Sequence, residues 1–286
     1  MTDALVSTDW LAAHIDDPKV VVLDGTYHLP TAKRDADAEF PDGHIPGAQR
    51  FDIDKVCDPD DPLPHMVPGA DAFAKAASAL GIDADTLVVA YDVYGMQSSA
   101  RTWWMFRLFG HDKVAVLDGG MPKWQAEGRP METGPAKRRP ATDFKARFRP
   151  ELVKSRDDVL AAVKAGDVQI VDARPAGRFT GEEAEPRPGM RSGHIPGSRS
   201  LPVTELVNKD TKMALDSDAV AAKFKAAGLD PSKPTISSCG SGVTACMIAL
   251  NAHRLGHPGM AVYDGSWSDW GSRQDTPVDT GPADAQ

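Results

Sequence analysis

Cysteine is scarce in this chain of 286 residues, which contains only Cys57, Cys239 and Cys246. Three cysteines over this length cannot form a dense disulfide framework, and their scarcity is typical of proteins from a reducing compartment. The sequence also lacks Cys-x-x-Cys pairs and Cys/His clusters at zinc-binding spacing. We therefore expect no structural metal and no cofactor.

Two further absences limit the partners that the chain can have. No apolar run approaches the roughly 20 residues of a transmembrane helix, and the first ten residues lack the basic and apolar regions of a secretory signal. Acidic residues outnumber basic ones by 41 to 32, which gives a formal net charge of −9. Because this charge repels phosphate groups, we expect no nucleic-acid or membrane partner and a cytoplasmic location.

The order of the predicted elements indicates an α/β fold. Continuous apolar runs, typical of strands buried on both faces, alternate with segments of helical periodicity. Such runs occupy positions 19–24, 86–91, 114–117 and 168–172. The alternation predicts mostly parallel sheets flanked by helices. Apolar and acidic residues also alternate at 51–54, where we predict a further short strand.

The same features occur twice in the same order. The sequence Gly-His-Ile-Pro-Gly at 43–47 returns at 193–197, and Asp-Gly-Gly at 118–120 returns as Asp-Gly-Ser at 264–266. Each copy of the second motif precedes a tryptophan, at Trp124 or Trp270. Several features repeated at nearly one spacing indicate a tandem duplication.

The length and the repeat together predict two domains, 1–128 and 151–286, joined by a linker at 129–150. The linker is rich in proline, threonine and basic residues. A short basic run in an acidic protein is typical of a solvated connection rather than of a nucleic-acid site. We expect Phe144 and Phe148 to attach it to a domain surface.

Cys239 stands at the junction of a predicted strand and a predicted helix. Apolar residues at 234–236 precede it, and Gly-Ser-Gly at 240–242 follows it before helical spacing begins at Val243. At such a junction, backbone amides and the helix dipole stabilise a thiolate. An isolated cysteine is more often a buried structural residue, but this setting favours a nucleophile.

The duplication assigns the nucleophile to one domain. Aligning the two predicted strands sets Asp92 opposite Cys239, and a longer loop at 93–99 replaces the glycine-rich one. We therefore predict that the second domain is catalytic and that the first has become a scaffold. The site is expected in the cleft between the domains, with residues contributed by the first.

These features resemble the tandem rhodanese-type sulfurtransferases over nearly the whole chain. Members that use thiosulfate have loops similar to Cys-Arg-Lys-Gly-Val-Thr, whereas the branch that uses 3-mercaptopyruvate has loops similar to Cys-Gly-Ser-Gly-Val-Thr. This chain has the second form, in Cys239, Gly240, Ser241, Gly242, Val243 and Thr244. The compact dianion thiosulfate would gain from two cations in the loop, and Gly240 and Ser241 supply none.

The resemblance implies a reaction and a set of residues. Cys239 would take the sulfur of 3-mercaptopyruvate as a persulfide, release pyruvate, and pass the sulfur to a thiol acceptor such as thioredoxin or a small thiol, or to cyanide. Arg178 and Arg187 match the substrate-binding arginines of the family, since guanidinium groups suit a keto-acid carboxylate. The residues that match its proton-transfer groups are Ser241, His65 and Asp54.

Four other residues of reactive type are interpreted as structural. His44 and His194 occur in both repeats, including the one without a nucleophile, which indicates that they stabilise a turn. Arg174 and Arg191 are likewise expected to hold the fold rather than the substrate.

Three alternatives to this function are considered. A thiosulfate-using rhodanese is disfavoured by the uncharged loop. A cysteine phosphatase of related fold would need an arginine six residues after the cysteine, where this chain has Ala245. The third alternative, from another class, is a non-catalytic module that binds or senses persulfides.

Overall fold

The computed structural model describes residues 4–230 and 232–283. The first three of the ten N-terminal residues, in which we expect no secretory signal, lie outside the described residues. The chain forms two compact units. Unit 1 consists of 1–60, 67–149 and 209–214; unit 2 consists of 61–66, 150–208 and 215–286. Each half of the sequence thus contributes one short segment to the other unit. No helix among the described residues is long and apolar enough to cross a membrane.

Unit 1 contains a five-stranded parallel sheet in the order β1-β5-β4-β2-β3. Its strands are β1 (Leu5–Val6), β2 (Val20–Asp24), β3 (Gln49–Arg50), β4 (Leu87–Tyr91) and β5 (Val114–Leu117). Its helices are α1 (Thr8–His14), α2 (Ala36–Glu39), α3 (Ala70–Ala79), α4 (Ser99–Leu108) and α5 (Gly120–Ala126), with 3₁₀ turns η1 (Pro30–Ala32) and η2 (Phe40–Asp42). Helices α1 and α5 pack on one face of the sheet, where Leu11 and Trp124 share a core cluster with Val22 and Val89.

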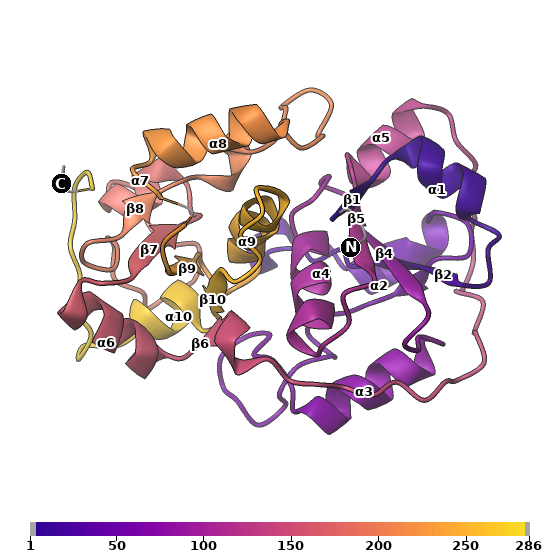
Figure 1. Cartoon of the computed structure of the whole chain (residues 1–286), viewed down its shortest axis with the longest axis horizontal. Helices are drawn as coiled ribbons and strands as arrows, with labels where there is room; N and C mark the ends of the chain where they lie inside the picture. Colours follow the sequence, from indigo (N-terminus) through magenta and orange to yellow (C-terminus); the bar gives the residue numbers. More distant parts are fainter. Residues whose placement is uncertain (1–3, 231, 284–286) are drawn as a thin grey trace. The chain divides into compact units, whose positions relative to one another are not determined.

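Unit 2 repeats this plan, with the sheet order β6-β10-β9-β7-β8 and all strands parallel. Its strands are β6 (Val153–Lys154), β7 (Gln169–Asp172), β8 (Arg199–Ser200), β9 (Thr235–Ser238) and β10 (Ala261–Tyr263). Its helices are α6 (Arg156–Ala165), α7 (Ala176–Thr180), α8 (Ser217–Ala226), α9 (Ala245–Arg254) and α10 (Ser266–Trp270), with 3₁₀ turns η3 (Pro150–Leu152) and η4 (Val203–Glu205). Figure 1 shows α6 and α10 on one side of this sheet and α8 and α9 on the other. The predicted α/β class, with two domains of parallel sheet flanked by helices, is confirmed.

The strand predicted at 51–54 is wrong. Strand β3 comes earlier and ends at Arg50, after which the Asp52 carboxylate accepts the amide of Asp54 (2.9 Å) and the Asp52 carbonyl accepts the amide of Val56 (2.9 Å). These bonds form a turn. The alternation that suggested a strand arises because Phe51 and Ile53 are both buried while the aspartates between and after them face outward.

Strand register confirms the internal alignment of Asp92 with Cys239. In unit 1, Asp24 of β2 pairs with Tyr91, the last residue of β4; in unit 2, Asp172 of β7 pairs with Ser238, the last residue of β9. The next residues are Asp92 and Cys239, each at the carboxyl end of a central strand. The helix predicted from Val243 begins two residues later, at Ala245.

The basic segment expected as a linker runs along unit 1 as far as residue 149. The Arg147 amide donates to the Phe109 carbonyl (2.8 Å) and the Thr142 amide to that of Ser78 (3.0 Å). Phe144 is buried against Phe73, with ring centroids 5.8 Å apart. Phe148 stays 45% exposed, so Phe144 is the main apolar anchor of the segment.

Candidate active site

Cys239 lies at the end of β9 with 2% of its surface exposed, and the first turn of α10 holds its backbone. The Cys239 amide donates to Ser266 Oγ (3.1 Å), and the Cys239 carbonyl accepts the Trp267 amide (3.0 Å). The next carbonyl, of Gly240, accepts both the amide (2.9 Å) and the hydroxyl (2.7 Å) of Ser268. The loop is therefore fixed by four bonds on one side.

This anchoring decides where the loop amides point. In a trans peptide the carbonyl and the following N–H point in opposite directions, so carbonyls held by α10 turn the amides of Gly240 and Ser241 away from it. Within the described residues, the amides of Gly240, Ser241 and Val243 donate to no protein acceptor. Gly242 has a φ of +75°, a conformation that suits glycine. The loop thus presents donors, at the start of α9, to a developing or bound negative charge.

His65 and Ser241 are brought together although they come from different halves of the sequence. His65 Nε2 lies 3.2 Å from Ser241 Oγ, and both residues are buried, with 4% and 5% exposed. The segment 61–66, which carries His65, belongs to unit 2. His65 also has a φ of +53°, a left-handed conformation that persists in a non-glycine residue only when its surroundings impose it.

Arg187 contacts the same serine. Its Nη2 donates to Ser241 Oγ (3.1 Å), and a guanidinium can only donate, so the serine oxygen accepts here. The hydroxyl proton of Ser241 can then be given to a neutral imidazole of His65. This arrangement is the one that a relay between Ser241 and His65 requires.

Both candidate substrate-binding arginines lie over the cysteine loop. A methyl group built on Gly240 would be 3.2 Å from Arg178 Nη2 and 3.6 Å from Arg187 Nη1. The absence of a side chain at Gly240 therefore leaves room for two cations above a loop that carries none. This geometry suits an anionic substrate next to the thiol.

Glu185, which the sequence did not single out, orients Arg178. Its carboxylate accepts from Arg178 Nε (3.1 Å), pairs with Arg178 Nη2, and accepts from Arg174 Nη1 (2.6 Å). Arg174 also donates to the Asp172 carboxylate through Nε (3.0 Å) and Nη2 (2.6 Å). Its guanidinium carbon lies 4.2 Å from the centroid of the Trp267 ring. Burial alone would lower the pKa of Arg174, but Asp172 and Glu185 outweigh it and raise the pKa. Arg174 is thus a permanently charged structural residue.

The remaining predicted residues have these positions. Arg191 donates to the carbonyls of Trp270 (2.9 Å) and Thr276 (2.8 Å), a structural role. Asp54 lies exposed in unit 1, where its carbonyl accepts the Cys57 thiol (3.0 Å), and its part in proton transfer stays a prediction. Burial and the nearby aspartates raise the pKa of Cys57, which disfavours it as a reactive thiol.

The two Gly-His-Ile-Pro-Gly histidines have matching environments. His194 stacks on Phe179 with centroids 3.8 Å apart, and its Nδ1 lies 2.9 Å from the Phe179 carbonyl. His44 stacks on Phe40 (4.0 Å), with Nδ1 3.0 Å from the Phe40 carbonyl. Since one copy is in the unit that has Asp92 in place of Cys239, this geometry supports their interpretation as structural.

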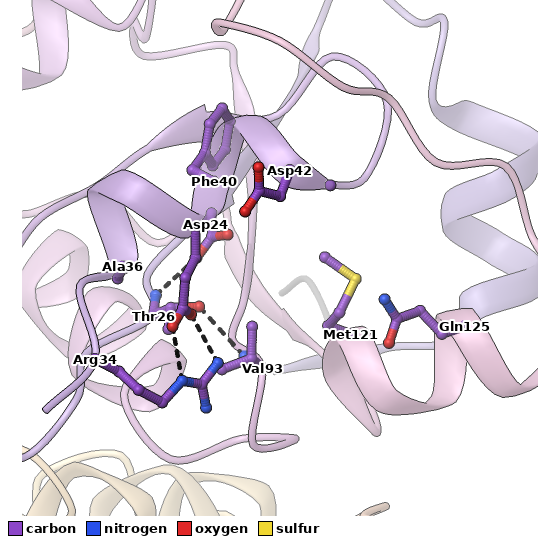
Figure 2. Close-up of a pocket in the computed structure, with 11 residues that line it drawn as sticks. Asp24, Thr26, Arg34, Ala36, Phe40, Asp42, Val93, Met121 and Gln125 are labelled. Carbon is purple, nitrogen blue, oxygen red and sulfur yellow. Dashed lines mark hydrogen bonds and ion pairs between the residues drawn. The ribbon is translucent and has the colours of Figure 1, made fainter. Parts of the chain in front are cut away.

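Unit 1 has a cavity of about 430 Å³ beside the position equivalent to the cysteine loop (Figure 2). Its lining includes Asp24 at the end of β2, Val93 after β4, and Met121 of α5. Asp92 occupies the position equivalent to Cys239, and its carboxylate accepts the amides of Tyr94 (2.8 Å) and Ser99 (2.8 Å). The Asp92 side chain therefore holds in place the loop that follows it in the sequence. The described residues contain no group of three or more His, Cys, Asp or Glu side chains that could hold a metal ion.

Comparisons with known proteins show which sequences and structures the chain resembles. The family model of the rhodanese-like domain matches residues 7–127 and again residues 155–273. The chain is 44% identical over 280 residues to 3-mercaptopyruvate sulfurtransferase of Escherichia coli (strain K12), covering 97% of this chain and 98% of that one. It is 42% identical over 274 residues to thiosulfate sulfurtransferase of Cricetulus griseus, covering 93% and 91%. A crystal structure of SseA from Escherichia coli, described as a 3-mercaptopyruvate sulfotransferase with the rhodanese fold, superimposes with a TM-score of 0.84 at 42% identity, covering 93% of this chain and 99% of that one.

Proposed function

Because this chain belongs to the family of rhodanese-like domain proteins, we propose that it transfers the sulfur of 3-mercaptopyruvate to an acceptor through a persulfide on Cys239. It is an enzyme, a transferase of sulfur-containing groups, with two rhodanese-like domains. The residue assignments that follow are proposals supported by the geometry of the site.

The first half-reaction breaks the carbon–sulfur bond of the substrate. The Cys239 thiolate attacks the substrate sulfur, a sulfur–sulfur bond forms, and the electron pair of the carbon–sulfur bond leaves on carbon as the enolate of pyruvate. The proton of the substrate thiol passes through Ser241 and His65, with Asp54 as the proposed orienting carboxylate, to that carbon. The products are pyruvate and a Cys239 persulfide anion, which the loop amides stabilise.

The single observation that carries the choice of donor is the charge distribution at the loop. Two arginines lie over Gly240, whereas the loop itself contains no cation. A keto acid needs donors for its carboxylate and ketone at a distance from its sulfur, and Arg178 and Arg187 meet this need. Thiosulfate would place its whole charge next to the thiolate, where this loop offers only amides. Overall identity is similar to relatives named for either donor, so the loop residues decide.

The test is a paired measurement of kcat/KM for 3-mercaptopyruvate and thiosulfate, with mass spectrometry of Cys239 after incubation with each donor. We expect 3-mercaptopyruvate to be the better donor and to add one sulfur atom to Cys239. Cys239→Ser should abolish pyruvate release, with Cys57→Ser, a partly buried cysteine of unit 1, as the control. Pyruvate release by Cys239→Ser would refute the persulfide, and a preference for thiosulfate would establish the alternative donor.

We further propose that the acceptor is a thiol, such as thioredoxin or a small thiol, or cyanide, and that the protein acts in the cytoplasm. The scarcity of cysteine supports a thiol acceptor and a cytoplasmic location, because a reducing compartment supplies free thiols. Purified persulfide-bearing protein, mixed with each acceptor in turn, should lose its extra sulfur fastest to the physiological class. Equal, slow loss to all three would contradict this part of the proposal.

A further inference from the structure

In each unit, the loop after the central strand is held by the last helix of the unit, α5 in unit 1 and α10 in unit 2. One backbone hydrogen bond is common to both units. In unit 2, the amide of Trp267 in α10 donates to the Cys239 carbonyl (3.0 Å). In unit 1, the amide of Met121 in α5 donates to the Asp92 carbonyl (3.0 Å). This bond occurs with and without a nucleophile, so it belongs to the fold. Contacts found in unit 2 alone are then candidates for a role in the reaction.

The first such contact comes from Ser266, which is equivalent to Gly120. Both residues have left-handed backbones, with φ of +49° and +52°. Glycine fits this conformation, and a methyl group on Gly120 would lie 2.6 Å from the Asp92 carbonyl oxygen. Serine at such an angle is strained, yet Ser266 is fully buried, with Oγ accepting from the Cys239 amide (3.1 Å) and donating to the Tyr263 carbonyl (2.8 Å). The catalytic unit thus keeps a strained residue whose hydroxyl binds the cysteine backbone.

The second contact comes from Ser268, which is equivalent to Pro122. Its amide and its hydroxyl both donate to the Gly240 carbonyl, at 2.9 and 2.7 Å. Proline has no N–H and no hydroxyl, so unit 1 cannot form either bond. In unit 1 the equivalent peptide, Val93–Tyr94, is held instead by the Tyr94 amide, which donates to the Asp92 carboxylate (2.8 Å). Bonds from α10 to the Gly240–Ser241 peptide are therefore particular to unit 2.

We propose that Ser266 and Ser268 are positioning residues for the reaction at Cys239. Ser266 fixes the backbone of the nucleophile, and Ser268 fixes the Gly240–Ser241 peptide so that the Ser241 amide faces the reacting sulfur. Neither residue touches substrate; both act through the loop. The inference rests on the proposed function, because the sulfur that the loop is held to receive is the persulfide sulfur.

Ser266→Gly introduces the residue that unit 1 uses, and it separates positioning from folding. The change relieves backbone strain but leaves the buried Cys239 amide without its acceptor, and because these effects oppose each other thermal stability should change little. We expect kcat with 3-mercaptopyruvate to fall about 10- to 100-fold, the effect of a misplaced reacting group, with KM within about twofold. Ser268→Ala should lower kcat in the same way, and Ser268→Thr, which keeps the hydroxyl, should restore it. Ser272→Ala is the matched control, since Ser272 is exposed just after α10 and bonds the Asp269 carbonyl (3.0 Å).

A second measurement keeps the inference independent of the donor. The rate of alkylation of Cys239 by iodoacetamide, followed on its own peptide by mass spectrometry, reports loop geometry without any substrate. It should change at least about threefold in Ser266→Gly and Ser268→Ala and stay unchanged in Ser272→Ala. Unchanged alkylation and kcat in folded variants would overturn the inference. If wild type fails to use 3-mercaptopyruvate, the proposed function is wrong, while a changed alkylation rate still supports positioning by the two serines.

Discussion

Ser241 Oγ lies 3.2 Å from His65 Nε2, although 176 positions separate the two residues in the sequence. Arg187 Nη2 donates to the same oxygen (3.1 Å), which leaves the hydroxyl proton of Ser241 directed to the imidazole. Two groups from distant parts of the chain thus converge on one hydroxyl of the cysteine loop. A buried serine hydroxyl that contacts both an imidazole and a guanidinium is suited to proton transfer.

The first prediction concerns the coupling of these two residues. Ser241→Ala and His65→Asn should each lower kcat with 3-mercaptopyruvate by about 10²- to 10⁴-fold, the usual contribution of positioned acid–base catalysis. Because they act as one relay, the double variant should be little worse than either single variant. A double-mutant cycle on kcat measures this, with the exposed Ser232→Ala as control. Additive losses would show that the two residues act separately.

The second prediction concerns the support of Arg178. Glu185→Gln keeps the shape of the side chain but removes the charge that orients the guanidinium, so KM for 3-mercaptopyruvate should rise about tenfold. Arg178→Lys should also raise KM, since an ammonium group cannot donate two parallel hydrogen bonds to a carboxylate as a guanidinium group does. Because Glu185 also faces the buried Arg174, its variant should lose about 3 kcal/mol of stability, whereas Arg178→Lys should not. Steady-state kinetics and urea unfolding of both variants separate an effect on substrate binding from an effect on folding. An unchanged KM in both would show that Arg178 does not bind the substrate carboxylate.

Much of this arrangement follows from the sequence because it depends on local patterns. Two apolar runs ending in Asp92 and Cys239, with repeated motifs around them, suffice to predict the parallel sheets and the equivalence of the two positions. The short strand was misplaced because Phe51 and Ile53 are buried by a turn, which gives the same alternation as a strand.

Long-range contacts could not be predicted in this way. Nothing in the sequence assigns the segment 61–66, and with it His65, to unit 2, since the first repeat contains it. Glu185 resembles any surface acid until its two arginine partners are known. Ser266 differs from Gly120 by one side chain, and only the shared left-handed backbone shows that this difference is unusual.

The third prediction tests the repeated histidines. His194→Ala removes a stacked ring and a bond to the Phe179 carbonyl, and it should destabilise the protein by about 2 kcal/mol. His44→Ala should do the same in unit 1. Neither change should alter KM in the folded protein, because neither ring is placed at the loop. Thermal unfolding with kinetics below the transition checks this; a selective loss of kcat in His194→Ala would give that residue a catalytic role.

The fourth prediction concerns Asp92, the residue of unit 1 equivalent to Cys239. Burial raises the pKa of Asp92 above its usual 3.8, although bonds from Ser99 and Tyr94 oppose the rise. Between pH 3.8 and the raised pKa the folded chain therefore holds a proton that the unfolded chain has lost, so this group's contribution to stability falls as pH rises through that range. Asp92→Asn does not titrate, and its amide cannot accept all three bonds, so it should be less stable by about 1–3 kcal/mol at pH 4. The difference from wild type should shrink between pH 4 and 7, as measured by urea unfolding.

Asp85 provides the control of opposite sign. It is exposed, and its hydrogen bond with Lys113 lowers its pKa, so its contribution to stability is present above its usual pKa of 3.8 and lost as pH falls. The difference between wild type and Asp85→Asn should therefore grow as pH rises toward 3.8 and stay nearly level from pH 4 to 7, where the Asp92 difference shrinks. If the Asp92 difference also grew with pH, its carboxylate would be ionised in the fold, stabilised by the Ser99 and Tyr94 donors beyond the effect of burial. The unit 1 loop would then stabilise an anion, the role that we propose for the equivalent loop after Cys239.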